Sequence, residues 1–211
     1  YLAENGADVI NMSWGSSTTS QLQGEVMAYA QGLGSLLVTS AGNERTSSLQ
    51  YPSALPGVLS VAAVNSTDRL TSYSNFGMSV DVAAPGGDGL RGLRSTIPSG
   101  YGSKQGTSMA SPIVAGVFAL VKSLHPQWSN RRLIEQVLGT AAPIDGLNAG
   151  FEGQLGHGRV DAFSALDGSP SSDPPELRLQ VMSVRVADDT GDGSLEPGEG
   201  AELRVALRNF N

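Results

Sequence analysis

The sequence predicts an α/β fold in which a mostly parallel sheet, incomplete at its N-terminal side, carries helices on both faces and is followed by the start of an all-β module. Short apolar runs at 8–13, 35–42, 58–64 and 80–86 do not alternate with polar residues. Such runs are typical of strands that are buried on both faces of a parallel sheet. Segments with helical spacing lie after the first and fourth runs, as α/β folds require.

Three segments have the pattern of helices. Ser20 and Gln23 match a capping box, which marks the start of a helix. Apolar residues then follow at helical spacing: Leu22, Val26, Ala30 and Leu33. Two more helices are expected at about 107–124 and 130–140.

The composition changes at 167–175, where the sequence DGSPSSDPP is typical of an exposed linker. Beyond it, LRLQVMSVRVA and AELRVALRN alternate apolar and polar residues, as half-buried antiparallel strands do. We therefore predict one α/β domain at 1–166, a linker at 167–175 and the start of a β-sandwich-like module at 176–211.

Composition limits the classes of partner. The 211 residues carry a formal net charge of −7, which argues against nucleic acid or an anionic membrane as the main partner. The longest apolar stretch, at 113–121, is about half of the ~20 residues that a membrane span needs. Because the sequence contains no cysteine, it offers neither disulfides nor a thiolate nucleophile.

Ser108 lies where a serine has two common roles. It stands in GTSMASPIVAGVFALV, at the first turn of a predicted helix. Ser108 or Thr107 is a helix N-cap in the simpler interpretation. In the other, Ser108 is a nucleophile, because the free N–H groups and positive partial charge of a helix N-terminus stabilise an oxyanion.

Two further motifs follow predicted strands, at the sheet edge where sites in open α/β folds collect. In SAGN (40–43), the amide of Asn43 is a candidate oxyanion donor, although an Asn after Gly is also ordinary in turns. The motif NMSWG (11–15) places small residues around Trp14 and reads equally well as a plain strand end.

Together these motifs resemble the subtilisin-like serine peptidases, the peptidase S8 family. The resemblance rests on GADVINMSWG, VTSAGN and GTSMASPIVAG in that order, with Asn43 and Ser108 65 residues apart. YPSALPGVLSVAAV, SNFGMSVDVAAPG, HPQWSNRRLIEQVLGTA and GHGRVDAFSAL match as well. It covers residues 1 to about 166, which would be the C-terminal part of the peptidase domain.

The resemblance implies a role for several residues. Ser108 would be the nucleophile, and Asn43 with the Ser108 N–H would form the oxyanion hole. One wall of the substrate groove would be Ser13, Trp14 and Gly15, and the wall of the primary pocket would be Ser40, Ala41 and Gly42. Tyr51-Pro52 matches a peptide bond that is often cis in this family.

The activating base is missing from the matched positions. A serine needs a base, which in this family is a His oriented by an Asp, and both precede the serine in the chain. The sequence holds two histidines, His125 and His157, both after Ser108 and both at positions that are not catalytic in the family. We therefore expect this chain to be a fragment whose Asp and His lie before Tyr1.

The resemblance implies a secreted bacterial serine endopeptidase that acts on protein or peptide substrates without a catalytic cofactor. The alternative is a non-catalytic relative that binds peptides or serves as a structural module. Ester hydrolysis is a third option, which the peptide groove disfavours. The sequence does not specify an oligomeric state.

The segment 188–199, DDTGDGSLEPGE, has the spacing of a calcium loop. Oxygen-bearing side chains fall at positions 1, 3, 5, 7 and 12 of that loop, with Gly193 at position 6: Asp188, Thr190, Asp192, Ser194 and Glu199. The flanking segments are predicted strands rather than the helices of an EF-hand. An acidic hairpin loop that binds no metal is therefore the other interpretation.

If this loop binds calcium, titration calorimetry of the chain should give a dissociation constant of about 10⁻⁴–10⁻³ M, the range of extracellular modules. Asp192→Asn should abolish the heat, whereas Asp167→Asn, outside the loop, should not. No heat at millimolar calcium would leave the acidic-hairpin interpretation.

Overall fold

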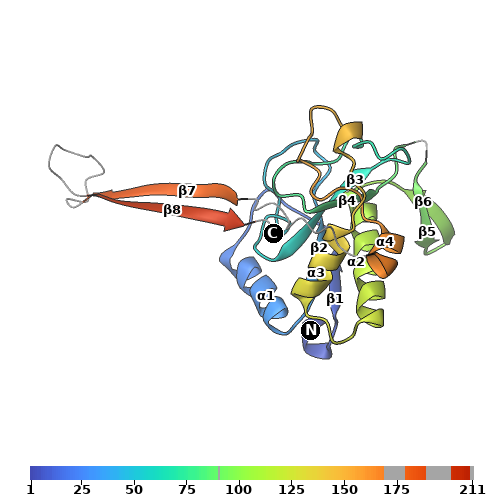
Figure 1. Cartoon of the computed structure of the whole chain (residues 1–211), viewed down its shortest axis with the longest axis horizontal. Coiled ribbons are helices and arrows are strands. Elements are labelled where there is room, and N and C mark those ends of the chain that lie inside the picture. The colour runs from blue at the N-terminus through green and yellow to red at the C-terminus, as the bar shows by residue number, and fades with distance from the viewer. Residues whose placement is uncertain (90, 169–178, 189–200, 210–211) are drawn as a thin grey trace. The chain divides into compact units, whose positions relative to one another are not determined.

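Four parallel strands form the sheet of the larger unit (Figure 1). They are β1 (Val9–Met12), β2 (Leu36–Ser40), β3 (Val58–Val64) and β4 (Val82–Pro85), in the order β1-β2-β3-β4. The computed structural model describes residues 1–89, 91–168, 179–188 and 201–209, and the chain divides into units at Tyr1–Pro175 and Glu176–Asn211. The predicted parallel α/β fold is confirmed for the first unit.

The two faces of the sheet are covered by different helices. On β2, Leu36 and Val38 join the cluster that contains Phe118 and Val121 of α2 (Thr107–Leu124). Leu37, which points the opposite way, packs instead with Met27 of α1 (Gln21–Gly32). This alternation along one strand places helices on both faces, as predicted.

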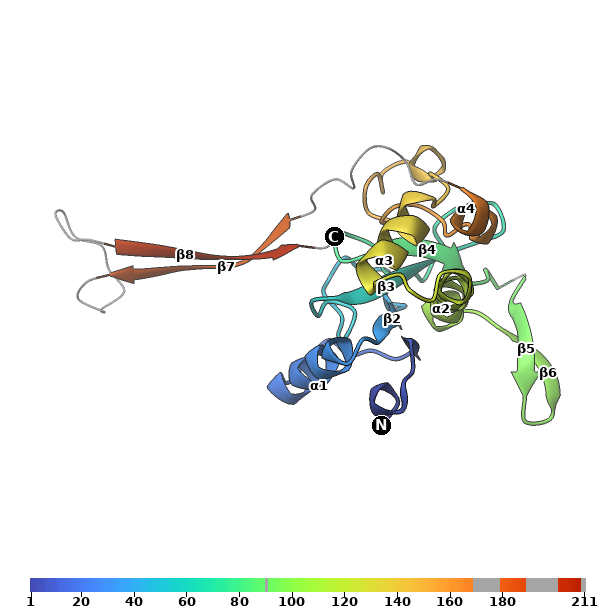
Figure 2. The same cartoon turned by 60° about the horizontal axis from the view of Figure 1, so that its bottom comes forward.

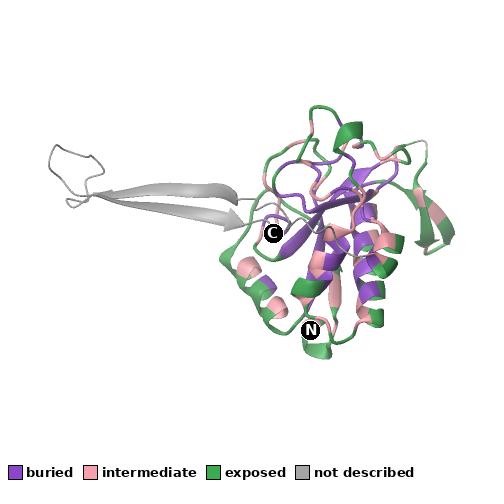
Figure 3. Cartoon of the chain, in the orientation of Figure 1, coloured by how far each residue is buried: buried purple, intermediate pink, exposed green. Residues whose placement is uncertain are grey.

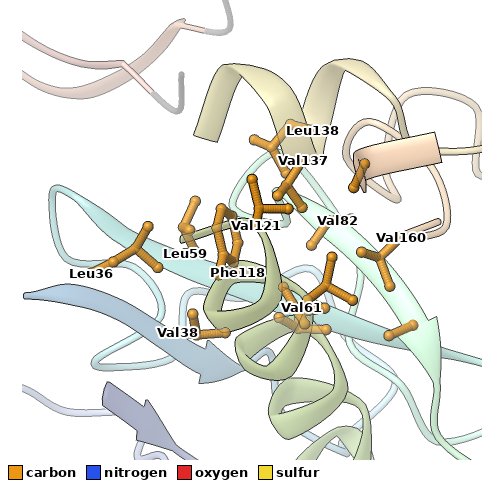
Figure 4. Packing of buried hydrophobic residues seen from close by; sticks show 14 of the residues in the cluster. Leu36, Val38, Leu59, Val61, Val82, Phe118, Val121, Val137, Leu138 and Val160 are labelled. Carbon is orange, nitrogen blue, oxygen red and sulfur yellow. The ribbon is translucent and has the colours of Figure 1, made fainter. Parts of the chain in front are cut away.

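The largest apolar cluster lies between the sheet and helices α2 and α3 (Asn130–Gly139) (Figure 4). Strands β2, β3 and most of β4 are buried, as is the inner side of α2, whereas β1 and the outer side of α2 are partly exposed (Figure 3). Among the described residues, α2 is the one helix long and apolar enough to span a membrane. Its packing against all four strands is that of a core helix.

Helix α1 begins as predicted but buries a different face. Ser20 is its N-cap and accepts a hydrogen bond from the Gln23 N–H at 3.2 Å. Of the apolar residues at helical spacing, Ala30 packs against the core cluster, whereas Leu22, Val26 and Leu33 are 68%, 50% and 48% exposed. Met27 anchors the helix instead.

Several elements complete the fold. A 3₁₀ turn, η1 (Ala3–Asn5), precedes β1, and η2 (Asp145–Leu147) and α4 (Ala162–Asp167) follow α3. An antiparallel hairpin of β5 (Leu93–Ile97) and β6 (Gly100–Lys104), not predicted from the sequence, projects from the unit just before α2 (Figure 2).

The second unit contains an antiparallel pair, β7 (Leu179–Asp188) and β8 (Ala201–Asn209). The two predicted alternating strands are thus present. The described residues of this unit form a two-stranded sheet, and the β-sandwich-like module stays a prediction.

Truncation of a buried side chain on α2 should lower the stability of the fold. Phe118 is fully buried between α2 and the sheet, so Phe118→Ala should lower the free energy of unfolding by about 3–5 kcal/mol. Leu120→Ala on the same helix removes a side chain that is 50% exposed and should cost less than about 1 kcal/mol. Urea denaturation followed by circular dichroism measures both, and equal losses would contradict this assignment of the core.

Candidate active site

Ser108 is the second residue of α2 and does not cap it. The N-cap is Gly106, with φ of +142°, which has no side chain with which to cap the helix. The Ser108 hydroxyl instead donates to the Ser13 carbonyl oxygen at 3.2 Å. Since neither Ser108 nor Thr107 is the N-cap, the simpler interpretation of GTS is wrong. The Ser108 hydroxyl is not used in capping the helix.

The Ser108 carbonyl accepts a hydrogen bond from Ser13, just after β1, instead of one from within the helix. Pro112 is the sixth residue of α2, rather than a first-turn residue, so it lacks the N–H that would bond to the Ser108 carbonyl four residues earlier. The Ser13 hydroxyl donates to that carbonyl oxygen at 2.9 Å. Ser13 and Ser108 therefore exchange two hydrogen bonds, which hold the candidate nucleophile against the strand end.

Asn43 is fixed to the same end of α2 through its side-chain oxygen. Asn43 Oδ1 accepts from the Thr107 N–H at 2.9 Å and from the Thr107 hydroxyl at 3.0 Å. These are the hydrogen bonds of the Asn43 side chain within the described part of the chain, and they leave the Nδ2 amide as a free donor. An added Cβ on Gly106 would lie 3.6 Å from Asn43 Oδ1 and 3.7 Å from the Ser108 nitrogen, so the Asn43 side chain and the Ser108 backbone both lie close to the N-cap residue.

The predicted groove residues lie on both sides of this point. Trp14 is half exposed just after β1, and the following chain pairs with the segment at the cis Tyr51-Pro52 bond through Ser16 and Tyr51. On the other side Ser40 and Ala41 are buried at the end of β2. The next residue, Gly42, donates its N–H to the Thr107 hydroxyl at 3.3 Å, which ties this wall to α2.

A cavity of about 440 Å³ opens beside Ser108. Ser108, Met109, Pro112 and Ile113 of α2 line one side, and residues of the β5–β6 hairpin line the other. The hairpin thus lines one side of this cavity, which was not predicted from the sequence because its two short strands carry few apolar residues and are largely exposed.

Neither histidine reaches Ser108. His125 is the C-cap of α2, about 25 Å along the helix from Ser108, and its ring stacks on Trp128 with centroids 3.8 Å apart. His157 bonds through its backbone N–H to the Asp81 carbonyl, just before β4, whereas Gly106 lies beside Gly86, just after that strand. The structure thus places both histidines away from the candidate nucleophile, in agreement with the expectation from the sequence.

Two loop residues that the sequence reading did not single out contact both halves of the site. Asn75 is buried against the 41–44 turn, and the Tyr73 hydroxyl accepts from the Gly106 N–H at 3.2 Å. Burial raises the pKa of the Tyr73 hydroxyl above its ordinary value. Asn75 lies in the family-like stretch SNFGMSVDVAAPG, which begins at Ser74, and Tyr73 directly precedes that stretch.

Among the described residues there is no group of three or more His, Cys, Asp or Glu side chains that could hold a metal ion. The predicted calcium loop falls largely at 189–200, outside the described residues, and Asp188 is the last residue of β7. That prediction therefore stays a prediction.

Comparison with known proteins agrees with this geometry. Residues 1–159 match the family model of peptidase S8, the subtilase family. The chain belongs to the subtilase family. Its fold is therefore that of subtilisin-like peptidases, and a solved protease structure from Pseudoalteromonas arctica superimposes with a TM-score of 0.71 at 36% identity, over 77% of this chain and 51% of that one.

Curated subtilases are similar over different lengths. The halolysin-like extracellular serine protease Nep of Natrialba magadii is 37% identical over 95% of this chain and 37% of its own length. Subtilisin NAT of Bacillus subtilis subsp. natto is 42% identical over 67% of this chain and 37% of its own length. The chain thus spans about two fifths of the curated subtilases that it matches.

The raised pKa of Tyr73 predicts an alkaline sensitivity. Because the folded-state value exceeds the unfolded one, the neutral hydroxyl stabilises the fold below pH ~10, and this contribution is lost as pH rises through the folded-state value. Tyr73→Phe should flatten the fall in unfolding free energy above pH ~10, with Tyr101→Phe as the control for losing one phenol. An unchanged pH slope in Tyr73→Phe would contradict the assignment.

Proposed function

We propose that this subtilase is the C-terminal part of a serine endopeptidase that forms an acyl-enzyme on Ser108. The observation that carries the proposal is the joint placement of Ser108 and Asn43 at the N-terminus of α2. Asn43 is anchored by its oxygen on Thr107, so its amide nitrogen is available to an oxyanion. A catalytic donor needs this pre-set orientation because it then acts without reorganising during the reaction.

The reaction begins with attack of the Ser108 oxygen on a peptide carbonyl carbon. The hydroxyl proton passes to a base, the carbonyl oxygen becomes an oxyanion, and Asn43 Nδ2 and the Ser108 N–H donate to it. The base then protonates the leaving amine, which leaves an acyl group on Ser108 for hydrolysis by water. We propose that the base is a His, oriented by an Asp, and that both lie before Tyr1 in the natural protein.

The substrate would bind as an extended strand between the two walls. Ser13, Trp14 and Gly15 offer backbone groups on one side, and Ser40, Ala41 and Gly42 border the primary pocket on the other. Small side chains at these positions favour a roomy, mainly apolar pocket. The chemistry uses no cofactor, and calcium at 188–199 would have a structural role.

Several of the chain's curated relatives are named as proteases, and the name of one of them supports a secreted setting. The relative from Natrialba magadii is described as extracellular, and another, alkaline elastase YaB from a Bacillus strain, is 36% identical over 78% of this chain. These names favour an active peptidase over the non-catalytic, peptide-binding alternative. They also favour proteins or peptides outside the cell as the substrates.

Fluorophosphonate labelling of the natural protein tests the nucleophile. Labelling and peptide hydrolysis should both disappear in Ser108→Ala, because the variant lacks the oxygen that forms the acyl-enzyme. In subtilisin, itself a member of the family, loss of the nucleophilic serine lowered kcat about 10⁶-fold. Ser123→Ala, at the far end of the same helix, should label normally. Labelling that persists in Ser108→Ala would contradict the proposal.

The 211-residue chain alone provides the complementary arm of this test. With Ser108 donating to the Ser13 carbonyl and no base beside it among the described residues, the chain should react at a small fraction of the rate of the natural protein. Reaction at the same rate would place the base within these 211 residues and overturn the assignment of the missing His.

A further inference from the structure

The loop between β3 and β4 contacts the residues on both sides of the proposed oxyanion hole. We propose that Asn75 and Tyr73 are positioning residues for that hole: Asn75 fixes the turn that carries Asn43, and Tyr73 fixes the backbone that leads into Ser108. This inference rests on the proposed function, because it concerns how the same donors are held. Neither residue takes part in the chemistry itself.

Asn75 uses its complete hydrogen-bonding capacity on the 41–46 segment. Its Nδ2 donates to the Ala41 carbonyl at 3.0 Å and to Glu44 Oε2 at 2.8 Å. Its Oδ1 accepts from the N–H groups of Glu44 and Thr46 at 2.9 and 3.2 Å. With both donor hydrogens and both lone pairs engaged and 2% of the residue exposed, the side chain has one orientation.

Asn43 is held indirectly by this arrangement. Glu44 Oε2, which receives the Asn75 amide, also accepts from the Asn43 N–H at 2.9 Å. The Asn75 backbone N–H donates to the Gly42 carbonyl at 3.0 Å. Thus the residue before Asn43, the residue after it and its own N–H are all bonded to Asn75 or to a group that Asn75 orients.

Gly42 shows how closely the two segments approach. Its φ is +107°, a conformation that favours glycine, and an added Cβ would lie 2.2 Å from Asn75 Nδ2. The turn therefore leaves no space for a side chain between Asn43 and Asn75. This close contact means that a displacement of Asn75 is transmitted to the turn rather than absorbed by a gap.

Tyr73 acts on the other half of the site. Its hydroxyl lies 2.8 and 2.6 Å from the carbonyl oxygens of Gly86 and Gly87, just after β4, and accepts from the Gly106 N–H. Gly106 is the N-cap of α2, two residues before Ser108. The Tyr73 hydroxyl therefore links the end of the sheet to the residue that aims the first N–H groups of the helix.

Ser74, between these two residues, anchors the loop to the sheet. Its fully buried hydroxyl accepts from the Ala63 N–H of β3 at 2.8 Å and donates to the Asn75 carbonyl at 2.9 Å. A central strand thus fixes the loop, and the loop fixes both donors. Such support matters because a misplacement of about 1 Å in a reacting group can cost about 10²-fold in rate.

The test uses the natural protein and the isosteric change Asn75→Asp. Aspartate keeps the acceptor toward the Glu44 and Thr46 N–H groups but turns a carboxylate oxygen toward the Ala41 carbonyl and the Glu44 carboxylate, where the amide had donated. We expect kcat for a peptide substrate to fall about 10- to 100-fold with KM within about twofold, because oxyanion stabilisation acts in the transition state. Affinity for a peptide aldehyde, whose adduct carries the oxyanion, should fall in parallel.

Asn148→Asp is the matched control. Asn148 is also a buried asparagine, 5% exposed, with its amide bonded to the Asp68 and Ile144 carbonyls and its oxygen to the Leu70 N–H. Its loss should lower thermal stability to a similar degree without changing kcat. A purely structural role for Asn75 would make the two variants alike in both measurements, and that result would overturn the inference.

Tyr73→Phe provides a second variant, in case Asn75→Asp does not fold. It removes the hydroxyl and keeps the ring, so the Gly106 N–H retains its 2.9 Å bond to the Gly86 carbonyl but loses the one to Tyr73. We expect kcat to fall about threefold to tenfold at constant KM, the size of a typical net hydrogen-bond contribution. An unchanged kcat in Tyr73→Phe, or a change in KM alone, would overturn the inference.

Amide hydrogen exchange separates this inference from the proposed function. In Asn75→Asp, the Asn43 amide should lose protection, whether or not the protein hydrolyses peptides, because its acceptor, Glu44 Oε2, loses the Asn75 donor and faces a second carboxylate. If the unaltered natural protein has no peptidase activity, the proposed function fails, and retained protection of the Asn43 amide in Asn75→Asp would overturn the inference independently. If the protein is active and Asn75→Asp keeps full kcat, the inference alone fails.

Discussion

The geometry of the site depends on the contact between the N-terminus of α2 and the C-terminal ends of β1 and β2. Burial of Phe118 and its neighbours fixes where this helix lies on the sheet. Pro112 then leaves the Ser108 carbonyl without a helical partner, and Ser13 supplies one. The hydrogen bond that Pro112 cannot make is therefore replaced by one from Ser13, which holds the candidate nucleophile at the strand end. The replacement matters because an unpaired carbonyl in a partly buried region costs free energy.

The same end of α2 also orients Asn43, the proposed side-chain donor to the oxyanion. Thr107 donates twice to Asn43 Oδ1 and accepts from the Gly42 N–H, so a single residue beside the nucleophile orients the opposite wall. The orientation of the Asn43 amide follows from this, because an oxygen fixed on Thr107 directs the nitrogen away from it. Packing of α2 on the sheet, through a few hydrogen bonds, thus determines where a developing negative charge would be stabilised.

Much of this arrangement could be predicted from residue patterns. Uninterrupted apolar runs indicated the four parallel strands, and the spacing of GTS and SAGN indicated Ser108 and Asn43. Positioning by Tyr73 and Asn75 could not be predicted, because it depends on loops whose side chains bond to backbone groups distant in sequence. Periodicity also failed on α1: it finds an apolar stripe including Leu22 and Val26, but only tertiary contacts decide which stripe is buried.

The hydrogen bond of the Ser108 hydroxyl shows what this chain provides for catalysis and what a base must add. Its hydroxyl donates to the Ser13 carbonyl at 3.2 Å, a long contact for a hydroxyl donor, and a base must compete for that proton from about 3 Å away. His125 is held by Trp128, and His157 by the backbone near β4, so neither can do so without unfolding its surroundings. The first unit therefore holds the proposed oxyanion donors and the proposed groove residues close to a serine whose hydroxyl has no base beside it among the described residues. The weak acceptor at Ser13 keeps this hydroxyl aimed while leaving its proton accessible, which is the state that an approaching imidazole would require.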